Sequence, residues 1–143
     1  MIKEVKNIED ANRCDELLTQ LILDERKYND AIDPNIVITN HFNQMLNDDN
    51  IILLGYYLDK EIVGYILIRK IDENTCLLDG LYVLEKHRNK GIGNSLLNEA
   101  IERSKRLNVK YIDINVMEKN EVAKQIYKKL NFIEYEIKLR KTI

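Results

Sequence analysis

Residues 81–97 read LYVLEKHRNKGIGNSLL, and this stretch decides the fold because it joins a strand pattern to a helix pattern through a glycine loop. The apolar run 81–84 predicts the end of a strand. Basic residues, Gly91 and Gly93 follow, and then an amphipathic helix begins. Glycine lets backbone N–H groups turn inward, and the first N–H groups of a helix have no partner inside the helix. The loop therefore predicts an anion site, and a diphosphate is the ligand that suits it best.

Three kinds of phosphate-binding loop can be compared with this pattern. A nucleoside-triphosphate loop needs two glycines five positions apart followed by Lys and Ser or Thr, and that spacing is absent. A dinucleotide loop needs a third small residue where Leu96 stands, although Asp113 lies about 20 residues downstream, where that fold has its ribose-binding acid. The third kind is an acyl-CoA loop.

The composition indicates one globular domain, residues 1–143, with 45% hydrophobic and 32% charged residues. The chain has 22 basic and 24 acidic residues, and the formal charge of −2 argues against a nucleic-acid partner. The longest apolar run, 62–68, is too short to cross a bilayer, and no signal peptide opens the chain. We therefore expect a cytoplasmic protein with no membrane contact.

The cysteines and histidines predict neither a disulfide nor a metal site. Cys14 and Cys76 lie far apart in no paired motif, so we expect free thiols. His41 and His87 have no Cys or acid at ligand spacing.

Hydrophobic periodicity gives the order of the elements. It predicts strands at 1–5, 51–58, 61–71, 75–84, 110–116 and 132–140, and helices at 10–27, 34–46, 92–107 and 121–130. Asp33 and Pro34 suit the start of the second helix. Strand 110–116 is expected to run parallel to strand 75–84, because a helix connects them. The sum is an antiparallel meander followed by two crossover units, which is an α/β layered domain.

Two signatures resemble the GNAT superfamily of acyl-CoA-dependent N-acyltransferases. The first is Arg88-x-x-Gly91-x-Gly93, preceded by Leu81-Tyr82-Val83 and followed by Leu96-Leu97. The second is Asn120-x-x-Ala123-x-x-x-Tyr127-x-x-x-x-Phe132, with Asn131 where the family usually has glycine. Asn is a suitable replacement, because it tolerates the left-handed conformation at a helix end. The resemblance covers nearly the whole chain and implies a GNAT-like mixed, mostly antiparallel central sheet of about six to seven strands flanked by about four helices.

The resemblance implies acetyl-CoA as the acyl donor. The backbone of Leu81 and Val83 would bind the pantetheine arm, and the amides from Arg88 to Asn94 would surround the pyrophosphate. Lys86 and Lys90 either contact the nucleotide phosphates or are simply solvated. The implied cofactor-binding residues are Leu81, Tyr82, Val83, Arg88, Asn89, Lys90, Gly91, Ile92, Gly93, Asn94, Asn120 and Tyr127.

Two residues are candidates for proton transfer. The resemblance gives Tyr127 the role of the acid that protonates the departing thiolate, although a tyrosine at this helix position is often only packed. Asp79 is the candidate base and also a candidate for binding the amine, because it interrupts an apolar strand; its alternative is a structural ion pair. Alternation with period two predicts that Asp79, Leu81 and Val83 share one face, with Tyr82 on the other. By the same alternation Cys76 lies on the face opposite to Asp79 and is a poor nucleophile.

The acceptor is expected to be an amine. The stretch Leu-Asp-Gly-Leu-Tyr-Val, residues 78–83, resembles aminoglycoside 6′-N-acetyltransferases and suggests a small cationic amine, while a peptide amine stays open. Tyr28 and Asp30, in the loop 28–32, are candidate acceptor-binding residues. The alternatives are a longer acyl donor and an acyl-CoA-binding or partner-binding module without catalysis. A homodimer also stays open.

Overall fold

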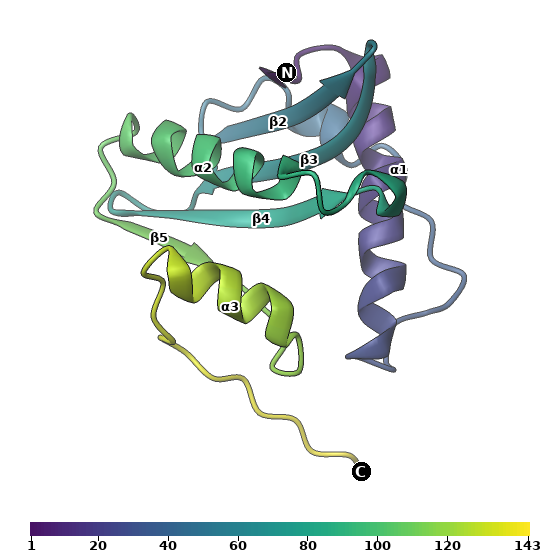
Figure 1. The fold of residues 1–143 in the computed structure, drawn as a ribbon, viewed down its shortest axis with the longest axis vertical. Helices are drawn as coiled ribbons and strands as arrows, with labels where there is room; N and C mark the ends of the chain where they lie inside the picture. Colours follow the sequence, from purple (N-terminus) through teal and green to yellow (C-terminus); the bar gives the residue numbers. More distant parts are fainter.

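The computed structural model describes residues 1–143 and contains one five-stranded sheet with helices on both of its faces (Figure 1). None of its helices is both long and apolar enough to cross a membrane. The strands are β1 (Ile2–Glu4), β2 (Ile51–Leu58), β3 (Glu61–Lys70), β4 (Thr75–Val83) and β5 (Tyr111–Ile114). The helices are α1 (Ile8–Asp24), α2 (Ile92–Lys105) and α3 (Glu121–Lys129), with one-turn 3-10 helices at Glu25–Lys27, Phe42–Met45 and Glu85–His87.

The sheet order is β1-β2-β3-β4-β5, and only the β4–β5 pair is parallel. The predicted mixed α/β fold and the parallel crossover are therefore confirmed. The β2–β3 hairpin turns at Asp59 and Lys60, whose φ angles of 49° and 69° are those of a primed turn that matches the twist of the two strands.

Two apolar clusters hold the layers together, one on each face of the sheet. On one face Ala11, Cys14 and Leu17 of α1 pack against β2, β3 and β4. On the other face α2 packs through Leu96, Leu97 and Ala100, and α3 lies at the edge of this second cluster. The two cysteines are confirmed as free: Cys14 lies in the first cluster and Cys76 in the second.

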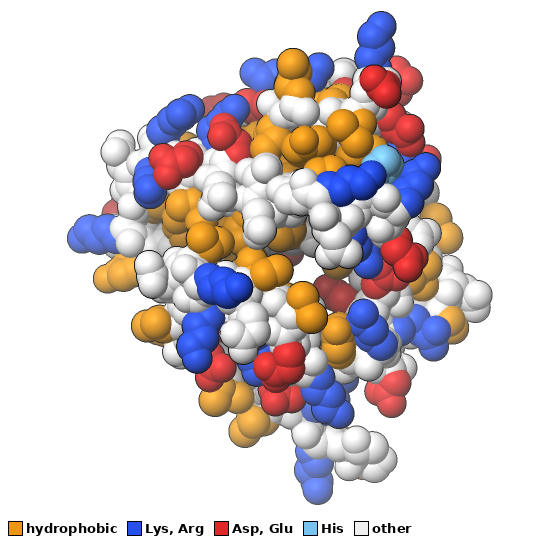
Figure 2. Space-filling view, in the orientation of Figure 1, with side chains coloured by type: hydrophobic (Ala, Val, Ile, Leu, Met, Phe, Trp, Pro, Cys, Tyr) orange, Lys and Arg blue, Asp and Glu red, His pale blue; other side chains and the backbone are white.

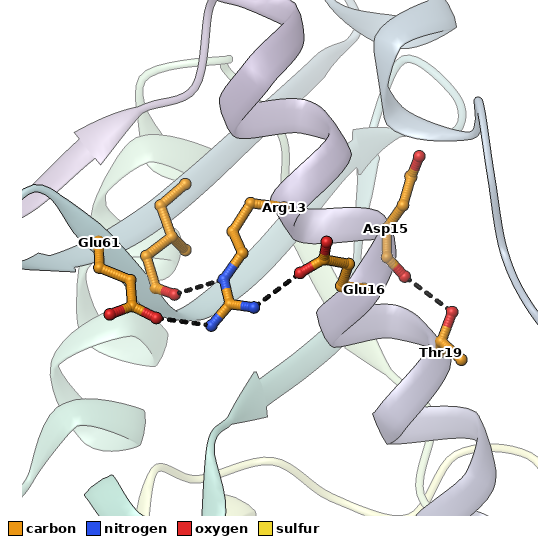
Figure 3. A network of polar contacts seen from close by, with 6 residues as sticks. Arg13, Asp15, Glu16, Thr19 and Glu61 are labelled. Carbon is orange, nitrogen blue, oxygen red and sulfur yellow. Dashed lines mark hydrogen bonds and ion pairs between the residues drawn. The ribbon is translucent and has the colours of Figure 1, made fainter.

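Polar contacts fix α1 against the start of β3, as Figure 3 shows. The Arg13 guanidinium donates to Glu16 at 2.7 Å, to Glu61 at 3.0 Å and to the carbonyl of Ile62 at 3.2 Å. The helix begins at a conventional cap, because the Asn7 side chain accepts from the N–H of Asp10 at 2.8 Å. The orientation of α1 determines where its carboxyl end, residues 20–24, and the 3-10 turn Glu25–Lys27 lie relative to β4.

The helix expected at 34–46 is wrong, because only the single turn Phe42–Met45 is helical. The segment 36–39 consists of four β-branched residues in a row after Pro34 and Asn35, and such residues disfavour helix. Asp15 of α1 is buried, and its carboxylate accepts from the N–H groups of His41 and Phe42 at 3.3 Å and 3.0 Å. Tertiary hydrogen bonds therefore replace the helix ladder in this segment.

The strand expected at 132–140 is also wrong. Its residues are extended, but from Ile133 onward no backbone group forms a hydrogen bond within the chain. A strand exists only where a neighbouring strand pairs with it, and this segment leads away from β5 (Figure 1). The observed five strands and three α-helices consequently fall short of the expected six to seven strands and four helices.

A bulge in β4 reverses the predicted alternation of its side chains. Asp79 pairs with Leu67 and Tyr82 pairs with Tyr65, so the ladder shifts between these pairs, and Gly80 there has a φ of +77°. Asp79 and Tyr82 consequently lie on the α1 face, whereas Leu81 and Val83 pack on the α2 face. The prediction that Asp79, Leu81 and Val83 share a face is therefore wrong, and the opposed placement of Cys76 and Asp79 is confirmed.

Replacing Gly80 should destabilise the protein strongly. A Cβ at Gly80 would lie 2.6 Å from the Tyr65 hydroxyl, and its φ is left-handed. We expect Gly80→Ala to lower the free energy of unfolding by about 2–4 kcal/mol, from backbone strain and overpacking together. The matched control is Gly91→Ala, with a φ of +81° and no atom within 4 Å of an added Cβ. It should cost only about 1–2 kcal/mol. Equal losses in urea denaturation would contradict this account.

Candidate active site

The parallel strands β4 and β5 separate near the middle of β4. Their pairing runs from Thr75 opposite Tyr111 to Leu78 opposite Ile114 and goes no further. Beyond Leu78, residues 79–83 of β4 pair with β3 alone. The outer backbone edge of this half-strand is therefore open to an extended ligand that pairs with it as another strand would.

Figure 2 shows a hollow in the molecule. Figure 1, which has the same orientation, shows that the hollow lies between α1, α3 and the carboxyl end of β4. Acidic side chains, drawn in red, lie at its margin. Between α1 and the end of β4 there is also a cavity of about 550 Å³, lined by Gln20, Asp24, Tyr82, Leu84, Glu85 and Lys86. The open half of β4 is thus bordered by free space on the α1 side.

The glycine loop presents a run of unused backbone donors. No N–H group from Asn89 to Asn94 donates a hydrogen bond to any protein atom. The loop reaches this conformation through left-handed residues, Asn89 at φ 62° and Gly91 at φ 81°. The space at Gly93 is open, because an added Cβ would meet only Val83, at 3.8 Å. Free donors, the start of α2 and exposed Lys86 and Lys90 together suit a polyanion.

The Arg88 side chain holds this loop in place through contacts with β4 and α1. Its Nε donates to the carbonyl of Val83 at 2.8 Å, its Nη2 pairs with Asp24 of α1 at 3.2 Å, and its guanidinium lies 5.1 Å from the centre of the Tyr82 ring. Its own N–H donates to Glu85. The free donors consequently begin at Asn89, one residue later than the sequence suggested.

Helix α3 brings Tyr127 to the cluster that lies under α2. The Tyr127 ring is half-buried and meets Phe132 edge-on, with ring centres 5.9 Å apart. Burial raises the pKa of the Tyr127 phenol, and its hydroxyl forms no hydrogen bond within the protein. It therefore stays protonated at neutral pH and is free to donate.

The two ends of α3 are formed as the sequence predicts. The side chain of Asn120 caps the first turn by accepting from the N–H of Ala123 at 3.2 Å. At the other end Asn131 has a φ of 68°, and Phe132 N–H donates to the carbonyl of Tyr127 at 3.0 Å. This is a Schellman ending, in which Asn takes the usual place of glycine.

Asp79 lies in a polar environment on the α1 face. Its carboxylate is 3.7 Å from Arg69 Nη2, and about half of its side chain is exposed. Glu25, at the end of α1, has a raised pKa, first because it is partly buried and second because the Asp79 charge is near. The Tyr65 hydroxyl beside Gly80 is buried and has no hydrogen-bond partner. The structure therefore places the charges of Asp79 and Glu25 near each other, where the divergent half of β4 begins.

The sequence did not predict a role for Glu25. The periodicity of a helix does not show that its end lies near Asp79, which is on a strand distant in sequence.

Of the two expected acceptor residues, Tyr28 is half-buried beside Lys27, and Asp30 is exposed. Neither has a hydrogen bond or ion pair to Asp79. The structure contains no group of three or more His, Cys, Asp or Glu residues that could hold a metal ion.

Known proteins resemble this chain in both sequence and fold. Streptothricin acetyltransferase A of Bacillus subtilis (strain 168) is 32% identical over 78 residues, which are 54% of this chain and 45% of that protein. The match thus spans about half the length of that relative.

Among solved structures, a mutant of the BH1408 protein from Bacillus halodurans has a TM-score of 0.84 at 20% identity, covering 100% of this chain and 99% of that chain. AAC(6')-Iy in complex with a bisubstrate analogue of CoA has a TM-score of 0.74 at 16% identity, covering 100% and 99%. The predicted acetyltransferase with acetyl-CoA from Clostridium acetobutylicum has a TM-score of 0.77 at 19% identity, covering 99% and 96%. These structures share the fold of this chain.

The model of one family matches most of the chain, from residue 15 to residue 132. That range contains both signatures, the divergent strands and the glycine loop with its free donors. The chain belongs to the acetyltransferase (GNAT) family.

Proposed function

We propose that this protein is an N-acetyltransferase that moves an acetyl group from acetyl-CoA to a primary amine by direct attack. The observation that carries the proposal is the run of free N–H groups from Asn89 to Asn94 next to the open edge of β4. Membership of the family and the relatives solved with CoA or acetyl-CoA support the choice of donor.

The cofactor would bind in two parts. The open edge at Leu81 and Val83 would pair with the amides of the pantetheine arm, and the loop N–H groups would bind the pyrophosphate. A hydrogen bond to a charged group contributes about 1.5–3 kcal/mol. A handful of such bonds is sufficient for micromolar affinity, which corresponds to about 8 kcal/mol, after the costs of association. Asn120 and Tyr127, at the start and the middle of α3, would border the arm.

The reaction needs one group that accepts a proton and one that donates it. The amine nitrogen would attack the thioester carbon, and the C–S bond would then break. Asp79 would hold the incoming ammonium and take its proton, directly or through water. Tyr127 would protonate the departing thiolate, since its pKa lies above the usual value of about 10, and a thiol has one near 8.5.

A small cationic amine is the acceptor class that the surroundings of Asp79 support. The pKa of Glu25 is raised first by burial and second by the Asp79 charge, and a cation near both carboxylates would offset these two effects. Streptothricin acetyltransferase A and the aminoglycoside acetyltransferase AAC(6')-Iy are relatives whose names point to antibiotic acceptors. Tyr28 and Asp30, which follow Glu25 in the chain, would contact the remainder of the acceptor.

Gly93→Ala separates cofactor binding from folding. In the proposed complex the added methyl would crowd the pyrophosphate bound by the neighbouring N–H groups, whereas in the free protein it meets only Val83, at 3.8 Å. We expect the affinity for CoA, measured by calorimetry, to fall at least about tenfold (~1.4 kcal/mol). The free energy of unfolding should stay equal or rise, because Ala favours helix over Gly. The control is Asn98→Ala, at an exposed position of the same helix. Unchanged CoA affinity in the Gly93 variant would contradict the anion site.

Tyr127→Phe tests the acid. Only a hydroxyl without a protein partner is removed, so stability and CoA affinity should not change. We expect kcat for thiol release to fall by about 10²–10⁴-fold. The matched control is Tyr111→Phe, at an exposed position on β5, which should keep full activity. If Tyr127→Phe also keeps full kcat, the residue is only packed.

Asp79→Asn tests the base in an assay with a panel of amines. The isosteric change preserves the strand but removes the charge that would hold and deprotonate the amine. We expect kcat/KM for the amine to fall by about 10²–10⁴-fold while CoA affinity is retained. The control is Asp72→Asn in the exposed turn before β4. A chain that binds CoA but releases no thiol with any amine would be a binding module and would refute the proposed reaction.

A further inference from the structure

The hydroxyl of Tyr65 is a polar group in the core that has no hydrogen-bond partner. Tyr65 is fully buried, and no group of the protein forms a hydrogen bond with its hydroxyl oxygen. Its ring packs edge-on against Phe42, with ring centres 5.3 Å apart, and is thereby held in place. A buried hydroxyl without a partner destabilises the folded protein, and phenylalanine would fill the same space without this cost. Packing therefore accounts for the ring of Tyr65 but not for its oxygen.

The register of β3 and β4 places this hydroxyl next to Asp79. Asp79 lies opposite Leu67, and Tyr65 and Arg69 are the residues two positions to either side of Leu67. Residues two apart on a strand share a face, so Asp79 lies between Tyr65 and Arg69 on the α1 face. A Cβ added to Gly80, the residue after Asp79, would lie only 2.6 Å from the Tyr65 hydroxyl. The hydroxyl thus lies against the backbone beside Asp79.

The two neighbours of Asp79 lie on opposite sides of it along β4. Tyr65 pairs with Tyr82, in the open half of β4 where the thioester arm would bind. Arg69 pairs with Leu77, in the half that is paired with β5. A carboxylate directed at Tyr65 therefore points towards the proposed position of the thioester, and a carboxylate directed at Arg69 points away from it.

In the free protein the Asp79 carboxylate is held only loosely on the Arg69 side. The nearest charged atoms are 3.7 Å apart, which is too long for a hydrogen bond. The two side chains are 40% and 49% exposed, and an ion pair between exposed groups contributes little stability. The Nε of Arg69 is buried and also has no hydrogen-bond partner. Rotation of the carboxylate from Arg69 to its other neighbour consequently costs little.

We propose that Tyr65 is a positioning residue for Asp79, the base of the function proposed above. When a cationic acceptor binds, its ammonium group replaces Arg69 as the partner of the carboxylate. The Tyr65 hydroxyl then donates a hydrogen bond to the carboxylate and holds it on the side of the thioester. Tyr65 itself takes up no proton. This role rests on the proposed function, because it requires that Asp79 binds and deprotonates the amine.

The Tyr65 phenol is suited to donate a hydrogen bond and not to ionise. Burial first, and then the nearby acidic groups Cys14, Asp79, Glu25 and Asp15, raise the pKa of this phenol well above its usual value. It consequently keeps its proton at neutral pH. A hydrogen bond from a neutral hydroxyl to a carboxylate is stronger than one between two neutral groups. It would also remove the cost of the unpartnered oxygen.

Tyr65→Phe should change stability and activity in opposite directions. Removal of the unpartnered hydroxyl should raise the melting temperature of the free protein by about 2–5 °C. In an assay of thiol release with a panel of amines, kcat should fall about tenfold, because the carboxylate is no longer held towards the thioester. KM for the amine should change less than kcat, because the charge of Asp79 is still present, and CoA affinity should not change.

The matched control is Tyr57→Phe. The Tyr57 hydroxyl donates to Asp10 at 2.8 Å, far from Asp79 in the sequence and on another strand. This variant should lose stability and keep its kcat, which is the reverse of the pattern expected for Tyr65→Phe. A Tyr65→Phe protein that is less stable than the unmodified chain, or that keeps full kcat, would overturn the proposal.

A double-mutant cycle tests whether Tyr65 acts through Asp79. In the Asp79→Asn background, Tyr65→Phe should lower kcat no further, since the group that it positions is already absent. An equal loss in both backgrounds would show that Tyr65 acts independently and would overturn the proposal. Full activity of Asp79→Asn alone would refute the base of the proposed function and the role of Tyr65 with it. Loss of activity in Asp79→Asn but not in Tyr65→Phe would refute the role of Tyr65 alone.

Discussion

The end of the β4–β5 pairing at Leu78 opposite Ile114 is the constraint on which the rest of the site depends. Parallel strands that stay paired leave no backbone group available for a ligand. Here the second half of β4 has a free edge, and the hollow in Figure 2 lies beside it, between α1 and α3. The bulge at Gly80 falls in this free half and turns Asp79 towards α1 while Leu81 remains on the side of α2. One irregular strand thus has a free backbone edge and a carboxylate on the α1 face, the two features on which the proposed binding of cofactor and acceptor depends.

In the glycine loop, some residues leave their N–H groups free, and the neighbouring Arg88 fixes the position of the loop. Backbone N–H groups from Asn89 to Asn94 remain free, while the Arg88 side chain ties the loop to Val83 and to Asp24 of α1. A donor array that is held in place before the anion arrives loses little entropy on binding. The basic residue of the signature therefore acts here through its contacts with the protein, and the proposed site for the pyrophosphate consists mainly of main-chain donors.

Much of this could be read from the linear pattern because the causes are local. Alternation and helical spacing located five strands and three helices to within a few residues, since burial of one face imposes those periods. The same holds for the caps at Asn120 and Asn131, where the side chain or the left-handed residue acts within one turn. The Gly91–Gly93 loop belongs to this class too, because its free donors follow from a helix start and from glycine geometry.

The sequence by itself determined the elements, their order and the glycine loop of this GNAT-family chain, whereas tertiary structure decided which groups meet. Asp79 lies beside Glu25 only because α1 crosses β4 and because a bulge shifts the register by one residue, which exchanges the two faces of a strand. Segment 34–46 is not a continuous helix, because the N–H groups of His41 and Phe42 donate to the carboxylate of Asp15, a residue distant in sequence. The segment beyond Phe132 kept a strand pattern without a strand, because pairing requires a neighbour that periodicity alone does not provide.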